Sequence, residues 1–552
     1  MEILSIGSFI GFTLLVAVIA WLGTRGTNEK SADGYFLGGR SLGAITIAGS
    51  LLLTNLSAEQ IVGLNGQAFT EGILVMAWET LAAIAMILTA VVLLPKYMKQ
   101  GITTIPQFVE NRFDANTKSI LSTLFLFAYG LVLLPTVLYS GSLAFSTMFD
   151  LPTVLGISQQ ATIWICVWTI GIIGSIYAIF GGLKAVAVSD LINAIGLLIG
   201  GLLIPVFGLM AIGDDGSISS GLNTLWAENP EKFNLKGEVD SSIPFGTIFT
   251  GMILAQMYYW GTNQAILQRV FGGKSLKEAQ KGVILASLVK FLIPVIVVLP
   301  GVIAWNLFDG TLDNADLAYP ELVRRVLPPE FLGFFAAVLF GAVLSSFNSL
   351  LNSSATLFGF DLFKRHFKTD ATELETVKAG KKFGIGLALL ALFIAPFIGY
   401  APDGLFSYIQ QALGSLSVPI FAVIIVGIYT KHVPALGAKF VLIAGVIMYL
   451  ISLLGLGPYF TNSALETAAA NGITDPKALS VIKAEAYPHF LHIMGILFVV
   501  NVGIMLLFGA LKPKTTAYEP EVTKEIDTTP WKYAILAGGA ITILVLSTYF
   551  IF

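Results

Sequence analysis

Polar side chains interrupt an apolar segment, residues 42–69, that is long enough to cross a membrane. Five of them lie close together: Thr54, Asn55, Ser57, Glu59 and Gln60. An uninterrupted membrane helix rarely carries such a group at mid-depth, because burying an unsatisfied polar group in hydrocarbon costs free energy. We therefore predict that this stretch binds or relays something polar.

A second polar interruption lies at residues 256–264, inside the apolar segment 244–270. It falls five predicted spans after the first one. Two broken helices that open two blocks of five indicate an inverted-repeat transporter, in which unwound backbone at the membrane midplane offers carbonyls and helix ends to ions and substrate. Each interruption taken alone could instead be a kink satisfied by neighbouring helices.

The ninth predicted span carries hydroxyl and amide side chains on one helical face. Ser345, Ser349, Asn352 and Thr356 are spaced by four, three and four residues, which places them on the same side of a helix. Such residues can be simple close-packing contacts between membrane helices. They also suit a sodium ion, because a hard cation binds several oxygen ligands. The pattern leaves both interpretations open.

Four ionisable side chains are expected deep inside apolar segments: Glu59, Glu79, Asp190 and Lys290. Each indicates a functional site, because unpaired charge is costly in a membrane, and the alternative is that they neutralise one another as ion pairs. Glu79 and Lys290 can both bond hydroxyl groups, and with the face of Tyr259 they suit a neutral polyol. Glu79 would repel a carboxylate substrate. Three amides complete this set: Gln60, Gln256 and Gln410.

The composition predicts an all-α polytopic membrane protein. Of the 552 residues, 55% are hydrophobic and only 12% are charged, whereas a soluble chain carries about twice that share of charge. The net charge of -3 and the lack of a Lys/Arg stripe exclude a nucleic-acid surface. The lone Cys166 can form neither an internal disulfide nor a thiolate metal cluster. No histidine stands beside a nucleophile or metal partner in a core span, so we do not expect an enzyme.

Apolar windows of about 20 residues predict about fourteen transmembrane helices. We divide the single transmembrane domain, residues 1–552, into four parts: an extra N-terminal helix at 1–22, a first five-helix repeat at 42–213, a second five-helix repeat at 244–429 and three additional C-terminal helices at 436–552. The first segment is interpreted as a retained helix rather than a cleaved signal peptide.

Two boundaries between neighbouring spans fall at short breaks in the apolar pattern. The spans 160–180 and 184–213 are expected to meet at Gly181-Gly182-Leu183, and the spans 380–400 and 403–429 at Ala401-Pro402.

Basic residues are distributed unevenly over the predicted loops. If the N-terminus lies outside, the inner loops hold about four times as many Lys and Arg residues as the outer loops, and Arg112 and Arg269 are among the inner ones. This bias predicts that both termini are extracytoplasmic in the inner or plasma membrane. The outer segments 214–243, 309–329 and 457–487 are polar and long enough for short helices but not for a domain.

Three motifs resemble the solute:sodium symporter family, and most closely its sodium/sugar branch of sodium/galactose and sodium/glucose symporters. They are Asn55-Leu56-Ser57-Ala58-Glu59-Gln60, Tyr258-Tyr259-Trp260-Gly261-Thr262-Asn263-Gln264 and Ser345-Ser346-Phe347-Asn348-Ser349-Leu350-Leu351-Asn352-Ser353. Similarity at residues 35–42 and 181–186 extends the resemblance over nearly the whole chain. It implies a LeuT-like fold with a 5+5 inverted repeat and two broken helices, and sodium-coupled uptake by alternating access.

The resemblance also implies where Na+, the coupling ion, would bind. The main site would use the backbone carbonyls of Leu53, Leu56 and Ala342 and the hydroxyls of Ser345 and Ser346, with Asp190 close behind. Some members of the family form a second sodium site, which would fall on Asp190, Asn348 and Ser349.

The implied sugar site would be formed by Asn55, Gln60, Glu79, Gln256, Lys290 and Gln410. Its gates would be Tyr259 beneath the sugar ring and an outer lid of Leu64, Trp78 and Phe406. Two residues depart from the sodium/galactose pattern: Ala82 stands where a serine contacts sugar, and Gln256 where an asparagine does. A buried polar mismatch costs about 1–3 kcal/mol, so the preferred monosaccharide need not be galactose.

Several alternatives stay open. The same machine could carry sialic acid, an amino acid, a vitamin or choline, or the chain could be a sugar-gated sensor or channel that accumulates nothing. Protons could couple through Asp190 or Glu59, and Glu59 has no role beyond anchoring the broken helix. The partners expected are a small sugar, sodium and the lipid bilayer, with neither nucleic acid nor an obligate protein partner.

Overall fold

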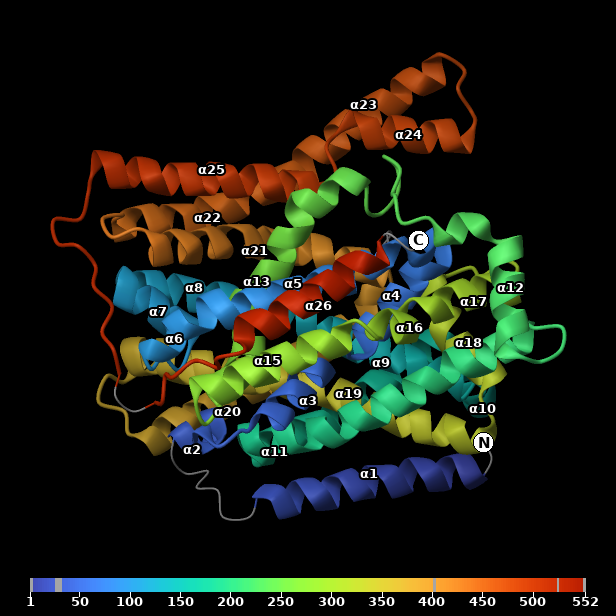
Figure 1. The fold of residues 1–552 in the computed structure, drawn as a ribbon, viewed down its shortest axis with the longest axis horizontal. Coiled ribbons are helices and arrows are strands. Elements are labelled where there is room, and N and C mark those ends of the chain that lie inside the picture. Colours follow the sequence, from blue (N-terminus) through green and yellow to red (C-terminus); the bar gives the residue numbers. More distant parts are fainter. Residues whose placement is uncertain (1–2, 25–31, 401–403, 524–525, 550–552) are drawn as a thin grey trace.

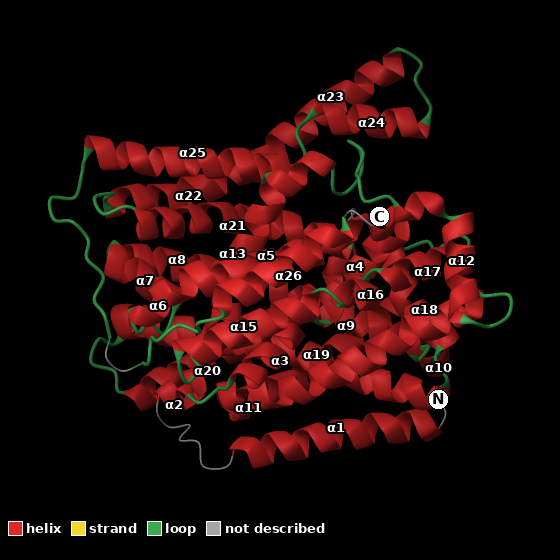
Figure 2. Ribbon diagram, viewed as in Figure 1, coloured by secondary structure: helices red, strands yellow, loops and turns green. Residues whose placement is uncertain are grey.

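The computed structural model describes residues 3–24, 32–400, 404–523 and 526–549. This part of the chain is helical almost throughout, and most of its long helices lie along the longest axis of the molecule (Figures 1 and 2). Within these ranges, nine helices are long and apolar enough to cross a membrane, or up to ten if one bent pair, Leu276–Lys290 with Ile293–Leu307, counts as a span. The helical class is confirmed, whereas the fourteen helices and the inverted repeat stay predictions.

The helices of the first half of the chain include the first broken helix. Their bounds are α1 Ile3–Thr24, α2 Ala32–Leu37, α3 Ala44–Asn55, α4 Ala58–Glu71, α5 Ala77–Leu88, α6 Leu94–Lys99, α7 Ile105–Arg112, α8 Ala115–Phe127, α9 Leu134–Met148, α10 Leu151–Leu155, α11 Gln159–Ile212 and α12 Ile218–Glu228.

The helices of the second half include the second broken helix. Their bounds are α13 Gly251–Thr262, α14 Gln264–Phe271, α15 Leu276–Lys290, α16 Ile293–Val297, α17 Leu299–Leu307, α18 Ala318–Val326, α19 Pro329–Thr356, α20 Glu373–Ile394, α21 Leu405–Tyr429, α22 Ala435–Ile451, α23 Gly457–Ala470, α24 Pro476–Ala486, α25 Phe490–Leu511 and α26 Ala534–Thr548.

The first predicted break divides α3 from α4. α3 ends at Asn55, Leu56 leaves the helical region (φ -85, ψ 59), and Ser57 is extended before α4 begins. An α-helix leaves its last four carbonyls without intrahelical partners. The Leu56 N–H donates to the carbonyl of Leu52 at 2.7 Å, and the Ser346 hydroxyl of α19 donates to the carbonyl of Thr54 at 3.0 Å. The break is therefore held open by a neighbouring helix and leaves further carbonyls for a ligand.

The second predicted break divides α13 from α14 at Asn263, whose backbone is extended (φ -70, ψ 123). The Asn263 side chain caps α14 by accepting the Ala265 N–H at 2.9 Å, and it also accepts the Tyr129 hydroxyl of the α8–α9 connection at 2.8 Å. An asparagine at this cap satisfies an N–H that a helix start leaves unpaired. Both interruptions thus lie within the stretches that the sequence predicts.

The expected boundary at Gly181-Gly182-Leu183 is wrong as a helix end, because α11 runs as one helical element of 54 residues. A straight helix of this length would measure about 80 Å, whereas the bilayer core is about 30 Å thick. Two parts of α11 are separately long and apolar enough to cross, Gln159–Ile176 and Leu183–Ile212. The other expected boundary, Ala401-Pro402, lies outside the described residues.

α3 packs closely against α11 because of a glycine. A Cβ on Gly49 would lie 2.9 Å from the Cα of Leu191 and 2.6 Å from its Cδ1. The missing side chain brings the neighbouring residues Ser50 and Asp190 within hydrogen-bonding distance. The broken helix is thereby positioned against α11.

The polar segment 457–487 folds into a helical hairpin. α23 follows α22 through a short π-helical turn at Ser452–Leu456, and α24 runs back from Pro476. Figure 1 shows this hairpin projecting from the bundle of long helices. The sequence prediction of short helices in segment 457–487 is confirmed.

Candidate cation and substrate sites

A buried cluster of charged and amide side chains lies beside the first break. The Lys290 ammonium donates to the Glu79 carboxylate and to the Asn55 side-chain oxygen. The other Glu79 oxygen accepts the Gln60 amide at 2.6 Å. Glu79 is 1% exposed and Lys290 is fully buried, so each charge depends on the other for compensation. Of the four buried ionisable residues, Glu79 and Lys290 pair with each other, and this pair lies where the sequence predicts a substrate site.

Gln256 connects two residues beside this cluster, Trp78 and Trp260. Its amide nitrogen donates to the Trp78 carbonyl at 2.8 Å, and its oxygen accepts the Trp260 indole N–H at 3.2 Å. The Trp260 ring in turn lies 5.4 Å from the Lys290 ammonium. Both ends of the Gln256 amide are thus engaged by protein groups. Gln410 is half-buried on α21, and within the described residues it forms no hydrogen bond with the cluster.

Aromatic and apolar side chains close the cluster on one side. The rings of Trp78 and Phe406 meet edge to face at 5.4 Å, and each residue is 3% exposed. α4 approaches Phe406 through Gly63, whose Cβ would lie 3.1 Å from the Phe406 Cβ, and the next residue, Leu64, is fully buried. The structure therefore brings the predicted lid residues together at one place.

The predicted inner gate, Tyr259, lies on α13 next to the cluster. It is within hydrogen-bonding reach of Asn55, and its ring meets that of Trp260 at 5.2 Å. Tyr259 therefore lies beside the polar cluster, four residues before the second break at Asn263.

The predicted main sodium site lies between the end of α3 and α19. Leu53, Leu56 and Ala342 are buried, and their carbonyls lie on these two elements. The Ser345 side chain lies near Asp190. Within the described residues, however, its Oγ and the Asp190 Oδ1 are buried without a hydrogen-bond partner of good geometry. Buried polar atoms normally have partners, so these two oxygens and the carbonyls of the break form a set that suits a sodium ion.

Arg269 of α14 is a buried cation beside the candidate sodium site that the sequence interpretation missed. It is fully buried, whereas the charge pattern had assigned it to an inner loop. Its guanidinium donates to the Ser50 hydroxyl at 2.9 Å and to Ser349 and the Ala265 carbonyl. Ser50 donates to the Asp190 carboxylate at 2.5 Å. Its position beside the interrupted motif is the signal that could have found it.

Arg269 bears directly on the predicted second sodium site. Its Nε lies 4.0 Å from the Asp190 carboxylate, and it contacts Ser349, so a fixed positive charge stands between two of the three predicted ligands. Both amide atoms of Asn348 are buried without a hydrogen-bond partner in the described part of the chain. A second cation would have to bind next to this guanidinium.

Arg112, also assigned to an inner loop by its charge, is fully buried as well. Its guanidinium donates to the carbonyls of Gly427, Thr430 and Val433 at 3.1 to 3.2 Å. It therefore ties α7 to the end of α21. Glu59 lies in the first turn of α4, where the positive end of the helix dipole stabilises a carboxylate.

Comparison with known proteins identifies the family. The model of the sodium:solute symporter family matches residues 35–445. The chain is 44% identical to the uncharacterized symporter YidK of Escherichia coli K12, over 100% of this chain and 91% of the relative. It is 32% identical to a sodium/glucose cotransporter of Vibrio parahaemolyticus (79% and 83%), and 28% identical to sodium/myo-inositol cotransporter 2 of Bos taurus (80% and 68%).

A solved structure shares the fold. The outward-open, substrate-bound structure of a Na+-coupled sialic acid symporter matches with a TM-score of 0.68 and 20% identity, covering 91% of this chain and 98% of that one. At this identity the match speaks for the fold alone. The chain therefore belongs to the sodium:solute symporter family: it is a multi-pass membrane transporter whose coupling ion is sodium, and not an enzyme.

Proposed function

We propose that this chain imports a monosaccharide or a closely related polyol, driven by inward sodium flow through alternating access. The observation that carries the proposal is the buried Glu79–Lys290 pair with Gln60 and Asn55, closed by Trp78 and Phe406. A carboxylate accepts hydrogen bonds from sugar hydroxyls, an ammonium donates to them, and aromatic faces pack on the ring.

The charge balance of the cluster favours a neutral solute. A polyol leaves Glu79 and Lys290 compensating each other, whereas an anionic or cationic solute would add an unpaired charge to a buried site. Two relatives are named for neutral polyols, glucose and myo-inositol. Anionic sialic acid and cationic choline fit this balance less well, and the carboxylate of an amino acid would be repelled by Glu79.

The sodium site explains coupling. An ion bound by the Leu53 and Leu56 carbonyls and Ser345 would hold the end of α3 against α19, and the same break carries Asn55 and Gln60 into the substrate cluster. Each ligand would then favour the binding of the other, as linkage requires. One ion moving down about 100 mV gains roughly 2.3 kcal/mol, and a tenfold gradient adds about 1.4 kcal/mol. Together these support accumulation of a few hundredfold.

The topology belongs to the same proposal. We place about fourteen helices in the inner or plasma membrane, with a five-plus-five inverted repeat and both termini extracytoplasmic. The uneven distribution of Lys and Arg over the loops supports this orientation.

Uptake into proteoliposomes tests the proposal. Uptake of labelled glucose, galactose, myo-inositol, sialic acid, proline and choline is measured with an inward sodium gradient and with a potassium or a pH gradient in its place. We expect sodium-dependent uptake of at least one polyol. Uptake that is equal with and without sodium would refute sodium coupling. Uptake of a charged solute alone would refute a polyol as the substrate.

Two variants, the first with a matched control, locate the sites. Ser345→Ala should abolish sodium stimulation, whereas Ser354→Ala, which removes another buried hydroxyl of α19, should retain it. Glu79→Ala should abolish sugar uptake and leave sodium binding intact. Undiminished uptake by Glu79→Ala would refute the substrate site.

A further inference from the structure

Asp316 lies in a short 3-10 turn, Ala315–Leu317, between α17 and α18. It is 7% exposed, and its Oδ2 accepts the N–H of Leu405, the first residue of α21, at 3.1 Å. The next residue on α21 is Phe406, which meets Trp78 over the substrate cluster. One hydrogen bond therefore joins this turn to the helix that carries the lid.

The same carboxylate contacts the outer half of the first broken helix. A Cβ on Gly66 of α4 would lie 2.9 Å from the Asp316 Oδ1 and 2.9 Å from the Ala315 carbonyl oxygen. Only a glycine permits this approach without a shift. The Asn314 side chain fixes the turn by accepting the Asp316 N–H at 2.9 Å. Asp316 thus lies where α4, α21 and the turn meet.

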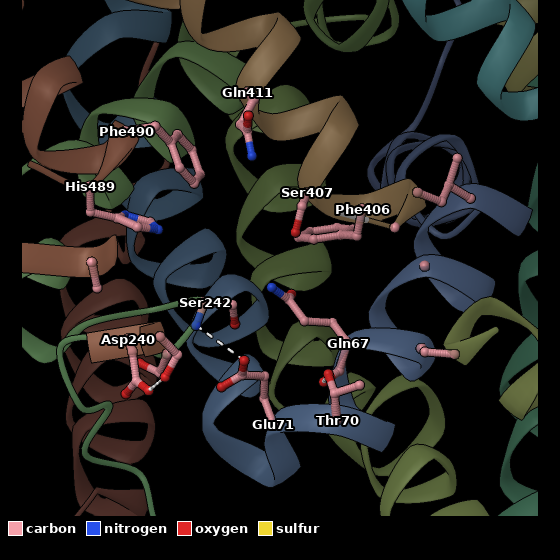
Figure 3. Close-up of a pocket in the computed structure, with 18 of the residues that line it drawn as sticks. Gln67, Thr70, Glu71, Asp240, Ser242, Phe406, Ser407, Gln411, His489 and Phe490 are labelled. Carbon is pink, nitrogen blue, oxygen red and sulfur yellow. Dashed lines mark hydrogen bonds between the residues drawn. The ribbon is translucent and has the colours of Figure 1, made fainter. Parts of the chain in front are cut away.

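Asp316 also borders a large cavity. The cavity has a volume of about 890 Å³, and Gly66, Leu405 and Phe406 line it together with Asp316. Figure 3 shows Phe406 and Ser407 on one side of it, near Gln67, with His489 and Phe490 opposite. In the proposed topology this cavity opens to the outside, so external protons reach the Asp316 carboxyl group.

We propose that Asp316 is a positioning residue for the lid: it fixes the first turn of α21, and hence Phe406, over the substrate cluster. External acid stabilises this closed position further. The inference rests on the proposed function for the orientation of the chain and for the role of Trp78 and Phe406 as a lid. It does not depend on which solute is carried.

The direction of the pH effect follows from burial. Burial raises the pKa of Asp316 to about 6, and the Leu405 N–H offsets only part of this rise. When α21 moves away and water reaches the carboxyl group, its pKa returns toward about 3.9. A group with a raised pKa in the closed state stabilises that state fully below its ordinary pKa, and the stabilisation is lost as the pH rises through about 6. The protonated acid keeps a carbonyl oxygen that still accepts the Leu405 N–H.

Other ionisable groups surround Asp316 on the elements that face it. Tyr139 of α9 lies beside it, and Asp313 is an exposed residue of the same loop. Across the cavity lie Glu71, Asp240, Lys483 and His489. Within the described residues none of these six donates a hydrogen bond to the Asp316 carboxylate, so the Leu405 amide reports on Asp316 itself.

Hydrogen exchange of the peptide that contains the Leu405 amide tests the proposal, with protein in sodium and without any sugar. Rates are corrected for the chemical effect of pH by comparison with the same peptide in the unfolded protein, and Asp313→Asn is the matched control that should keep the profile of the natural protein. In the natural protein we expect protection to rise about tenfold between pH 7.5 and 5. Asp316→Asn should be protected to the same extent at both pH values, and Asp316→Ala should lose protection about tenfold or more.

Two results would overturn the proposal: an Asp316→Asn profile that follows the natural protein, or unchanged protection in Asp316→Ala. If Asp316→Ala does not fold, the pH dependence of protection in Asp316→Asn alone tests the proposal. Because no sugar is present, failure here is distinguishable from failure of sugar uptake. The rate of labelled sugar uptake at saturating sodium gives a second measurement. External acid should raise the KM of the natural protein for sugar, because the lid is open in a smaller fraction of the molecules.

Discussion

The Lys290 ammonium donates to the Glu79 carboxylate across 211 residues of sequence, and both side chains are buried. The pair joins α15 to α5 immediately beside the first broken helix. Buried ion pairs add little stability in themselves, because desolvation offsets their attraction. The location of this pair among amides and aromatic rings is better explained by recognition of a solute.

A double replacement separates stability from recognition at this pair. Lys290→Met alone leaves a buried carboxylate without its partner and should destabilise the protein by about 3–5 kcal/mol. Adding Glu79→Met should restore most of the melting temperature and should not restore sugar uptake. Thermal unfolding in detergent and uptake are measured on the same preparations. Restored uptake in the double variant would show that the pair has only a structural role.

Arg269 should control sodium affinity through Asp190. Arg269→Lys keeps the charge, but a lysine cannot reach Ser50, Ser349 and the Ala265 carbonyl together as the guanidinium fork does. We expect the half-saturating sodium concentration to change by about tenfold, a shift of about 1.4 kcal/mol, with sugar affinity at saturating sodium little changed. Sodium titrations of uptake check this. An unchanged sodium dependence would remove Arg269 from the cation site.

Gly49 should be required for the position of the broken helix. Gly49→Ala places a Cβ 2.9 Å from the Leu191 Cα, so α3 must move away from α11 and the Ser50–Asp190 hydrogen bond must lengthen. We expect weaker sodium binding and a lower melting temperature. Gly386→Ala in α20 is the matched control, because its Cβ would meet nothing within 4 Å. Equal behaviour of the two variants would contradict this account.

Ala82 should help to select the sugar. It lies one turn after Glu79 on α5 and is 2% exposed, so Ala82→Ser introduces a hydroxyl beside the cluster. A matched buried hydrogen bond contributes about 1 kcal/mol, and the variant should therefore change the ratio of galactose to glucose affinity by about fivefold. Competition between the two labelled sugars measures the ratio. An unchanged ratio would place Ala82 away from the sugar.

The two broken helices could be predicted because their signal is local. Asn55, Gln60 and Asn263 are polar residues within apolar segments, and a membrane tolerates them only where backbone is unwound or a ligand binds. The sequence placed Glu79 and Lys290 at one polar site because each charge alone would be too costly, but it offered ion pairing only as an alternative, and their direct contact is a finding of the structure.

Other features depend on distant parts of the chain. Gln256 is engaged by the Trp78 carbonyl, 178 residues away, so its sequence neighbours could not show that its amide is already used. Arg269 and Arg112 were assigned to loops by charge, whereas their guanidinium groups are buried among carbonyls and hydroxyls contributed by other helices. The continuous course of α11 through Gly181-Gly182 likewise differs from the boundary expected from a short break in the apolar pattern.

The most direct test of sodium-coupled recognition is the equilibrium affinity of the purified protein for labelled glucose, or for the best polyol of the uptake panel, in sodium and in potassium. The account predicts that sodium tightens binding at least about tenfold, a coupling of about 1.4 kcal/mol, and that Ser345→Ala abolishes this gain whereas Ser354→Ala retains it. Equal affinity in sodium and in potassium would contradict it.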